Sequence, residues 1–449
     1  MKEVTRRFAR YVCSSKFEEL PAQVKHEGVR AFVNWVGCAA GGVAEEDVLL
    51  MLDFLREFNG PREATVIGHR ERLDVLNAAF INCMSSTALA FNDTHNASVA
   101  HPTSPVAAAL IALAERRPVT GRELLHALIL GIEVQCRVGN ILCVPPAECE
   151  VGLSMQGLVG AIGAAVAAAK ILALDEGGMT TAIGLAANQA SGLRQAQSTM
   201  ASHFTPGNAA RCGLMAALLA ARGFQCSDEM IEGPKGFAVS YGRNSNFGAG
   251  MDNLGVVFES TMLSFKPYPS GFVIHPIVDA CLEISRAHSF EPGQIERIEL
   301  TVNPLTVKLT NIVDPRDRGQ ALVSFQHWAA VALMFKAGGI AQVTDAVVRD
   351  PAVCALRRKV TYTSAEEVGR DAATVRVVLT DGRQLESRVV HCRGSTDRPL
   401  NDEDITDKTR AQLQAVYAAD TAEAILAKCW HVEELPLVGP FCKELAKAD

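Results

Sequence analysis

Two short polar segments carry the residues of this 449-residue chain that are best suited to chemistry. The first, "FNDTHNASVAH" (91–101), holds a carboxylate at Asp93, a hydroxyl at Thr94 and an imidazole at His101. An imidazole changes charge near neutral pH, so this segment has the groups needed for general acid–base catalysis. Apolar helical runs flank it on both sides. We therefore expect the floor of a site rather than a solvated loop.

The second segment is "FKPYPSGFVIHPIVDA" (265–280), in which Lys266 and His275 bracket two prolines and a glycine. A stiff interdomain linker with a solvated lysine is the plain alternative. Ligand sites favour domain junctions, however, and cationic side chains there can receive carboxylates. A third candidate, His327, lies in "VSFQHWAA" on an otherwise apolar helix. A lone imidazole of that kind is more often a core residue with satisfied hydrogen bonds.

The sequence contains no recognised signature of a metal or cofactor site. Asp93, His95 and His101 have a spacing that matches no metal motif such as HExxH, so we expect no metal. The glycines of "GLVGAIG" (157–163) recur every third residue without a preceding strand, which predicts helix packing rather than a dinucleotide loop. No phosphate loop, nucleophile elbow or Cys/His protease motif is present either.

Composition narrows the class of protein. The chain is 48% hydrophobic and 21% charged, as is typical of a soluble globular protein, and its net charge of −7 provides no basic surface for nucleic acid. Thirteen cysteines without a CxxC pattern indicate reduced thiols in a cytoplasmic protein. "TRRFARYV" (5–12) resembles a twin-arginine signal but lacks the following apolar region, so we interpret it as a first amphipathic helix. The apolar run 157–174 contains Lys170, which favours a core helix over a membrane span.

Hydrophobic periodicity predicts that most of the first 250 residues are helical. "TGRE" (120–123) is a capping box that opens one helix. The clearest predicted helices are 23–36, 46–58, 73–89, 106–117, 121–138, 156–173 and 208–222.

The pattern changes after Phe258. Residues 295–304 alternate as a strand, 323–339 form a helix that should end at its glycine pair, and 373–390 read as two strands joined by Asp381-Gly382. Residues 404–445 return to helical periodicity. The predicted fold is therefore mainly α with a second α+β domain. Its parts are a helical domain (1–258), a smaller α+β lid domain (259–403) and C-terminal helices (404–449) that pack back on the helical domain.

In combination, these segments resemble the landmarks of the MmgE/PrpD family. The resemblance includes "LILGIEVQCRVG", "NAARCGLMAALLAARGF" and "LTDGRQLESRV" besides the two polar segments, and it runs from "FEELPAQV" to "RPLNDED". The family includes 2-methylcitrate dehydratase, cis-aconitate decarboxylase and iminodisuccinate epimerase. The resemblance implies a homodimer with a site between its two domains. It also implies cofactor-free chemistry that moves a proton next to a carboxylate of a small di- or tricarboxylate.

Several site residues follow from this resemblance. The positions that match family motifs are Asp93, Thr94 and His101 (D-x-D-D-T…H-P), Lys266 and His275 (K-x-[YF]-P…H), and His327, where members carry tyrosine or histidine. We expect His101 to transfer the proton, with Asp93 or Thr94 orienting it or holding substrate. Lys266 and His275 should neutralise the charge that develops on the substrate carboxylate. His203 and His327 are second-rank candidates.

Four ionisable positions of the family are altered here. The two earlier aspartates of the first motif are Ala90 and Asn92, and a histidine before the glycine-rich helix is Ser154. A family lysine is Ser202, with His203 beside it. The resemblance places Ser154, Ser202, His203 and His327 among the expected substrate-binding residues. Loss of the family histidine and lysine removes positive charge from the expected pocket. We therefore expect a substrate that is less charged, or has fewer carboxylates, than citrate-like molecules.

The sequence leaves the reaction open. We expect a lyase, with dehydration as the first choice and epimerisation or decarboxylation as alternatives. A catalytically silent homologue that binds a carboxylate is the rival from another class, and the four substitutions favour it. The presence of both "DT…H" and "KPYP…H" argues against that rival, because an idle pocket has no chemical need for both clusters.

Overall fold

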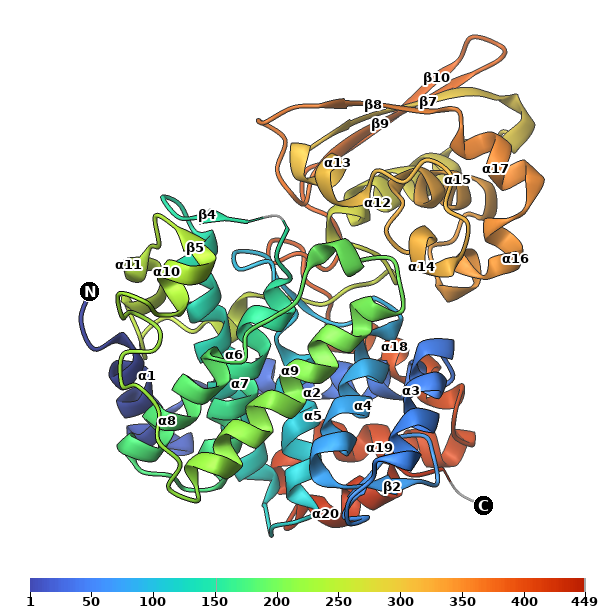
Figure 1. Ribbon diagram of the computed structural model, residues 1–449. Helices are drawn as coiled ribbons and strands as arrows, with labels where there is room; N and C mark the ends of the chain where they lie inside the picture. Colours follow the sequence, from blue (N-terminus) through green and yellow to red (C-terminus); the bar gives the residue numbers. More distant parts are fainter. Residues whose placement is uncertain (151, 448–449) are drawn as a thin grey trace. The chain divides into compact units, whose positions relative to one another are not determined.

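The structure is a computed structural model that describes residues 1–150 and 152–447. It forms two compact units (Figure 1). A helical unit comprises Met1–Ala88, Asn92–Ser264 and Asn401–Asp449, and an α+β unit comprises Leu89–Phe91 and Phe265–Leu400. The predicted fold class, a large helical domain with a smaller domain that contains a sheet, is confirmed. The unit borders lie a few residues from those expected at 258 and 403, and the sequence did not suggest that residues 89–91 join the second unit.

Small apolar residues let the helices of the first unit pack closely. Helix α6 (Gly121–Cys143) begins at the predicted capping box, where Thr120 and Glu123 exchange hydrogen bonds. Helix α7 packs on α5, α6 and α9, and a Cβ on its Gly163 would lie only 2.3 Å from Gln135 Oε1. The prediction that the glycines of "GLVGAIG" (157–163) serve helix packing is confirmed. The N-terminal helices are α1 (Val4–Ser14), α2 (Ala22–Gly41), α3 (Glu46–Glu57), α4 (Val75–Ala88), α5 (Thr103–Ala114), α6 (Gly121–Cys143), α7 (Met155–Ile171), α8 (Glu176–Ala187), α9 (Ala201–Ala220), α10 (Phe237–Tyr241) and α11 (Phe247–Met251).

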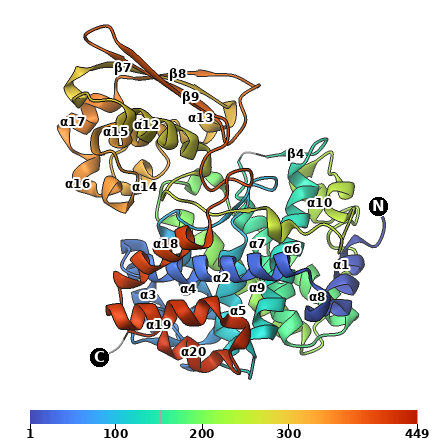
Figure 2. The same ribbon diagram turned by 180° about the vertical axis from the view of Figure 1, so that it is seen from behind.

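Three C-terminal helices complete this unit. They are α18 (Asp402–Gln414), α19 (Ala419–Trp430) and α20 (Val438–Glu444). Helices α18 and α19 lie against α2, and α20 lies against α5 (Figure 2). The end of the chain thus covers helices formed near its beginning.

Within the described part of the chain, one helix, α6, is long and apolar enough to cross a membrane when judged by length and composition. All of its most apolar window is buried inside the protein. A buried core helix passes the same test as a membrane span, so this helix is weak evidence for a membrane.

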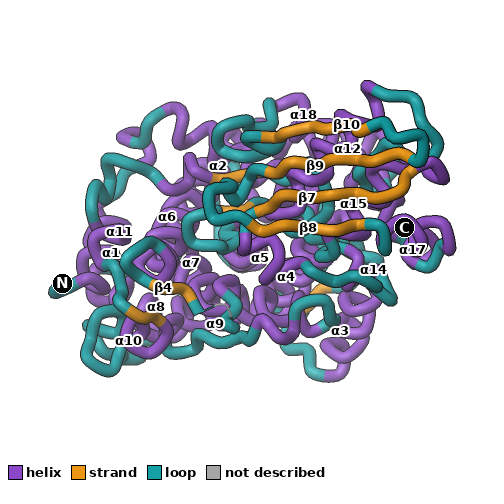
Figure 3. The backbone as a smooth tube through the Cα atoms, turned by 90° about the horizontal axis from the view of Figure 1, so that it is seen from above, coloured by secondary structure: helices purple, strands orange, loops and turns teal. Residues whose placement is uncertain are grey.

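The α+β unit is built on a four-stranded sheet with strand order β10-β9-β7-β8 (Figure 3). Its strands are β7 (Ile295–Val302), β8 (Val360–Ser364), β9 (Ala373–Leu379) and β10 (Gln384–Val389). The pairs β7–β9 and β9–β10 are antiparallel, whereas β7–β8 is parallel. Helices α12 (His275–Ala287) and α15 (Phe325–Phe335) contact the sheet and share its buried core. The predicted hairpin at Asp381-Gly382 is present, and Gly382 takes the positive φ of +87° that its turn requires.

Three local features differ from the sequence-based expectations. Strand β8, "VTYTS", was not predicted because it is mostly exposed and lacks apolar alternation. Helix α15 ends at Phe335, where Lys336 is left-handed with φ 53°, and so stops before the glycine pair. Helix α9 starts at Ala201 and includes Pro206, although proline has no N–H to donate and usually marks a helix start or break.

Candidate functional site

The segment 91–101 is largely buried, and all of it after Phe91 belongs to the helical unit. Its strand β3 (Thr94–His95) pairs with β6 (Leu263–Ser264), and His95 also bridges to Ala100. Backbone pairing of this kind satisfies the polar groups of a loop that water does not reach. The segment is therefore not a solvated loop, and its role as the floor of a site stays a prediction.

Asp93 and His101 are joined through the main chain. The His101 Nδ1 atom lies 2.6 Å from the carbonyl oxygen of Asp93, and 3.1 Å from Thr94 Oγ1. A carbonyl oxygen only accepts, so Nδ1 carries the proton and Nε2 is the basic nitrogen of the neutral ring. The Asp93 carboxylate is 1% exposed, and its Oδ2 atom accepts hydrogen bonds from Thr103 Oγ1 at 2.9 Å and Thr103 N at 3.3 Å.

A buried anchor that sequence reasoning missed fixes the middle of the segment. His95 contacts Ser98 Oγ through Nδ1 at 2.8 Å and Glu259 Oε2 through Nε2 at 2.9 Å. Burial of Glu259 acts to raise its pKa, but the hydrogen bond and charge of His95 together with the charge of Arg137 outweigh burial and hold that pKa below its usual value. Because both ring nitrogens of His95 are engaged, this ring holds the loop and is poorly placed to be a metal ligand.

Glu133 and Arg137 extend this network along α6. Arg137 Nε donates to Glu133 Oε1 at 2.6 Å, and the Ser260 amide donates to Glu133 Oε2 at 3.2 Å. The rest of the guanidinium is capped by main-chain carbonyls, including that of Val257 at 2.6 Å. Burial raises the pKa of Glu133 to about 7, against the pull of Arg137. These buried charges hold the 257–260 segment next to the loop and are too enclosed to receive a substrate.

The altered family positions in the helical unit have local hydrogen bonds. Ser154 is the N-cap residue of α7, and its amide donates to Gly192 O at 3.1 Å. Ser202 Oγ donates to Thr199 O at 2.8 Å. His203 Nδ1 lies 2.6 Å from Asp47 Oδ2 on α3. These hydrogen bonds do not connect the predicted substrate residues Ser154, Ser202 and His203 to His101, so their roles stay predictions.

Lys266 and His275 belong to the α+β unit. Lys266 is 2% exposed, and its Nζ atom donates to the carbonyl oxygen of Ala90 at 3.1 Å. His275 opens α12 and packs its ring against Tyr268 and Phe272, with centroid distances of 5.4 and 5.1 Å. Each unit thus contains one contact of its own next to these segments: Thr94 pairs with Ser264 in the helical unit, and Lys266 reaches Ala90 in the α+β unit.

A buried carboxylate holds the "KPYP" segment in place. Tyr268 Oη donates to Asp279 Oδ1 at 2.5 Å, and the Arg393 amide donates to Asp279 Oδ2 at 2.6 Å. Burial raises the pKa of Asp279 despite these donors. Sequence reasoning missed Asp279 because it lies on α12 among apolar residues, where nothing marks it as the partner of a tyrosine eleven residues earlier.

His327 is a core residue of the α+β unit. It is fully buried, its Nε2 atom contacts Gln342 O at 2.8 Å, and Arg357 approaches Nδ1 at 3.5 Å. Burial lowers its pKa to about 4, so the ring is neutral at physiological pH. These are the contacts of a core histidine whose hydrogen bonds are satisfied, and they argue against the predicted substrate role.

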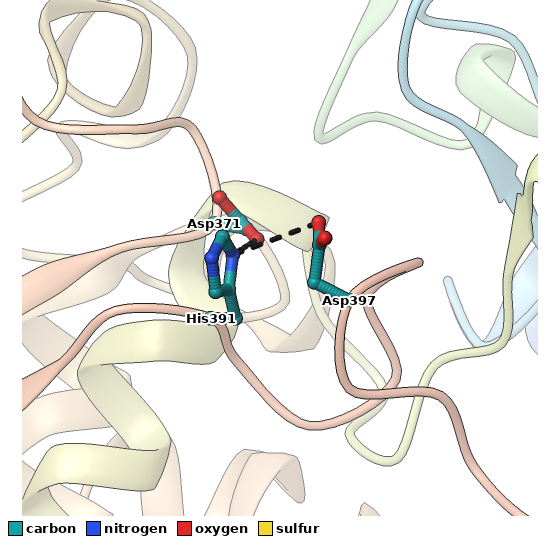
Figure 4. Close-up of side chains that lie close together, drawn as sticks. All are labelled: Asp371, His391 and Asp397. Carbon is teal, nitrogen blue, oxygen red and sulfur yellow. Dashed lines mark hydrogen bonds and ion pairs between the residues drawn. The ribbon is translucent and has the colours of Figure 1, made fainter.

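Three exposed or half-buried side chains of the α+β unit are close enough to hold a metal ion. Ligand atoms of Asp371, His391 and Asp397 lie within 4.8 Å of one another (Figure 4). His391 Nδ1 is 2.8 Å from Asp371 Oδ2 and 3.7 Å from Asp397 Oδ2, and the hydrogen bond with Asp371 raises the pKa of His391. Both carboxylates face the same ring nitrogen, which is the arrangement of an ion-pair cluster.

Comparison with known proteins identifies the family. The MmgE/PrpD N-terminal domain matches residues 6–249, and the MmgE/PrpD C-terminal domain matches residues 268–432. The chain belongs to the MmgE/PrpD family. Cis-aconitate decarboxylases from Mus musculus and Aspergillus terreus (strain NIH 2624 / FGSC A1156) are each 26% identical, over 97% and 92% of this chain and 92% and 90% of their own lengths. A 2-methylcitrate dehydratase from Cupriavidus necator is 25% identical over 82% of this chain and 81% of its own length. These relatives in the MmgE/PrpD family are enzymes that carry out lyase-type reactions.

Proposed function

We propose that the protein is a lyase that acts on a small carboxylic acid by moving a proton next to a carboxylate, without a metal or cofactor. The observation that carries this proposal is the hydrogen bond from His101 Nδ1 to the Asp93 carbonyl. It keeps the ring in the tautomer whose Nε2 atom is basic, which is the state a general base requires.

The proposed reaction begins when His101 Nε2 removes the proton α to the substrate carboxylate. Negative charge then develops on that carboxylate, and positive charge or hydrogen-bond donors must stabilise it. We assign this role to Lys266 and His275 from their places in the family motif. In a dehydration, the hydroxyl group leaves from the neighbouring carbon, the double bond forms, and the proton taken by His101 can be returned to the departing oxygen as water.

Dehydration is the leading reaction because it starts with proton removal by a neutral base. Decarboxylation is the second candidate, supported by the cis-aconitate decarboxylases that match this chain over more than nine-tenths of its length. It would instead need protonated His101 to deliver a proton to the carbon that loses carbon dioxide. Epimerisation needs removal of the proton from one face of the α carbon and delivery of a proton to the opposite face. The alternative to an enzyme is a catalytically silent homologue that only binds a carboxylate.

The substrate is proposed to be less charged than citrate-like acids. Ser154 and Ser202 stand where family members carry histidine and lysine, so two sources of positive charge are missing. A site with less positive charge binds tricarboxylates less well, because each unpaired carboxylate must be desolvated.

Exchange of substrate hydrogen with solvent deuterium tests the reaction class directly. Simple 2-hydroxy acids, 2-methylcitrate, cis-aconitate and iminodisuccinate would each be incubated with the protein in deuterium oxide and followed by NMR. We expect exchange or product formation with a simpler hydroxy acid. Turnover of 2-methylcitrate or cis-aconitate at roughly 1 to 1,000 per second would contradict the substrate proposal. Absence of exchange with every acid would favour the silent homologue.

We further propose a cytoplasmic homodimer, following the family resemblance and the reduced cysteines. The structure shows no disulfide bond among the cysteine side chains that it describes. Light scattering coupled to size-exclusion chromatography would give about twice the chain mass of 48.1 kDa for a dimer. A monomer at micromolar concentration would contradict this proposal.

A further inference from the structure

The loop 95–100 is closed at its base by two main-chain hydrogen bonds. The His95 amide donates to the carbonyl oxygen of Ala100 at 2.8 Å, and the Ala100 amide donates back to that of His95 at 3.3 Å. His101, the proposed base, is the next residue, and its Nδ1 atom lies 3.1 Å from Oγ1 of Thr94, the residue before His95. The two chain segments that leave the base of the loop therefore meet at the His101 ring, and a shift of His95 would move both.

Glu259 is the hydrogen-bond acceptor for the His95 ring. Burial acts to raise the pKa of Glu259, but its hydrogen bond with His95 and the charge of Arg137 hold that pKa below its usual value. The carboxylate is therefore ionised at neutral pH, where it only accepts hydrogen bonds, and His95 Nε2 donates to its Oε2 atom at 2.9 Å. His95 is 1% exposed, so bulk water cannot take the place of this acceptor.

Helix α6 supports the other end of the loop. A Cβ on Gly139 would lie only 2.5 Å from Ser98 Cβ, so the helix and the loop are in close contact. Ser98 is fully buried, and its carbonyl oxygen accepts from Cys143 Sγ at 3.6 Å. The tip of the loop thus rests on α6, whereas the base of the loop is held from the side of Glu259.

The chain around Glu259 is itself fixed to both the helix and the loop. Glu259 begins the helical turn η3 (Glu259–Met262), which leads directly into β6, the strand that pairs with β3 at Thr94 and Ser264. The next residue, Ser260, donates its amide to Glu133 Oε2 on α6 at 3.2 Å. Glu259 therefore offers its carboxylate to His95 from a backbone that is held on both sides.

We infer that Glu259 is a positioning residue for the proposed lyase reaction: through His95 it fixes the base of the loop and thereby the orientation of the His101 ring. Without this carboxylate, the buried N–H of His95 would lose its acceptor, and an unsatisfied buried donor is costly. The His95 ring would turn toward another partner and loosen the loop, and His101 Nδ1 would no longer be held at the carbonyl oxygen of Asp93. This inference rests on the proposed function.

Three variants test the inference. Glu259→Ala removes the acceptor, Glu259→Gln keeps an oxygen that can accept from His95, and Glu434→Ala is the matched control, because Glu434 pairs with His431 at 3.2 Å on the surface. In Glu259→Ala we expect kcat to fall by roughly tenfold to a hundredfold with little change in KM, because a small displacement of a catalytic group has an effect of this size. Glu259→Gln should recover most of that loss, and Glu434→Ala should match the parent protein.

A second measurement does not depend on activity. Nitrogen NMR of protein labelled in its histidine rings, with His101 assigned by His101→Asn, reports which nitrogen of the neutral ring carries the proton. We expect His101 to be protonated at Nδ1 in the parent protein and in Glu259→Gln, and to exchange between the two tautomers in Glu259→Ala. Should Glu259→Ala fail to fold, Glu259→Met fills a similar volume and still removes the oxygen that accepts from His95.

The outcomes separate the inference from the proposed function. Tautomer exchange of His101 in Glu259→Ala, in a protein that turns over no acid, would support the inference about Glu259 while refuting the lyase. A His101 ring that stays protonated at Nδ1 in Glu259→Ala would overturn the inference, whatever the activity. Equal loss of kcat in Glu259→Gln and Glu259→Ala would also overturn it, because the hydrogen bond to His95 would then not be what matters.

Discussion

The His101 Nδ1 atom lies 2.6 Å from the main-chain carbonyl oxygen of Asp93, and this contact orients the ring. A carboxylate partner would favour the protonated ring, whereas a carbonyl fixes the tautomer and adds no negative charge. The carbonyl at Nδ1 thereby leaves Nε2 as the ring nitrogen that can accept a proton. The Asp93 carboxylate meanwhile accepts a hydrogen bond from Thr103. This bond fixes the backbone whose carbonyl oxygen orients His101.

Replacement of the proposed base should abolish proton transfer. His101→Asn keeps an amide near the Asp93 carbonyl but provides no base, so we expect solvent exchange or turnover to fall at least about 100-fold. Kinetics on the acid found by the deuterium screen would measure this. His431→Asn, at an exposed histidine beside Glu434, is the control. Equal activity in both variants would remove His101 from the mechanism.

Relief of backbone strain at Ala90 should stabilise the protein. Ala90 has a φ of 50°, a left-handed conformation that disfavours residues with a Cβ, and its carbonyl receives Lys266. We expect Ala90→Gly to raise the free energy of unfolding by about 1 kcal/mol. Ala78→Gly inside α4 should instead lower it by about 1 kcal/mol or more. Thermal melts would compare the two, and a lower melting temperature for Ala90→Gly would contradict the argument.

A buried histidine should make the protein sensitive to acid. Burial and the charge of Lys170 lower the pKa of His126 to about 4, and its Nε2 atom contacts Ser15 Oγ at 3.0 Å. Between pH 6.5 and 4 the unfolded chain takes up a proton that the folded ring resists, so stability falls as pH falls.

His126→Gln should weaken this pH dependence by roughly 3 kcal/mol over that range. Gln can still hydrogen-bond to Ser15, which keeps the comparison at neutral pH fair. Melting temperatures measured from pH 7 to pH 4 would give the two slopes. Identical slopes would show that His126 does not titrate as proposed.

Chelation tests the proposed metal independence. We expect dialysis against EDTA to leave activity unchanged. If activity is lost, His391→Ala and Asp371→Asn show whether the Asp371, His391 and Asp397 cluster is the source. Parallel loss in those variants would overturn the metal-free proposal and move the site of chemistry to the α+β unit.

Local patterns were sufficient to predict most elements, whereas long-range partners were not predictable. The capping box at Thr120 and the hairpin at Gly382 depend on neighbours in sequence, and both were predicted. Strand β8 was missed because an exposed edge strand needs no apolar alternation.

The candidate site shows the same division. The motifs gave Asp93 and His101, and their direct contact was within reach of the sequence because they are eight residues apart. Glu259 was missed, because it contacts this segment from 164 residues away and belongs to no local motif.

The interrupted path of the chain through the helical unit has a consequence for synthesis. Helix α2 leaves the ribosome early, yet α18, which covers it, is translated only after the whole α+β unit. Until α18 has been made, the apolar face of α2 that it covers stays exposed. A nascent chain in this state is prone to aggregate and to bind chaperones. Translation that stops before residue 401 should therefore yield an aggregation-prone product, although it has already passed every motif residue of the proposed site.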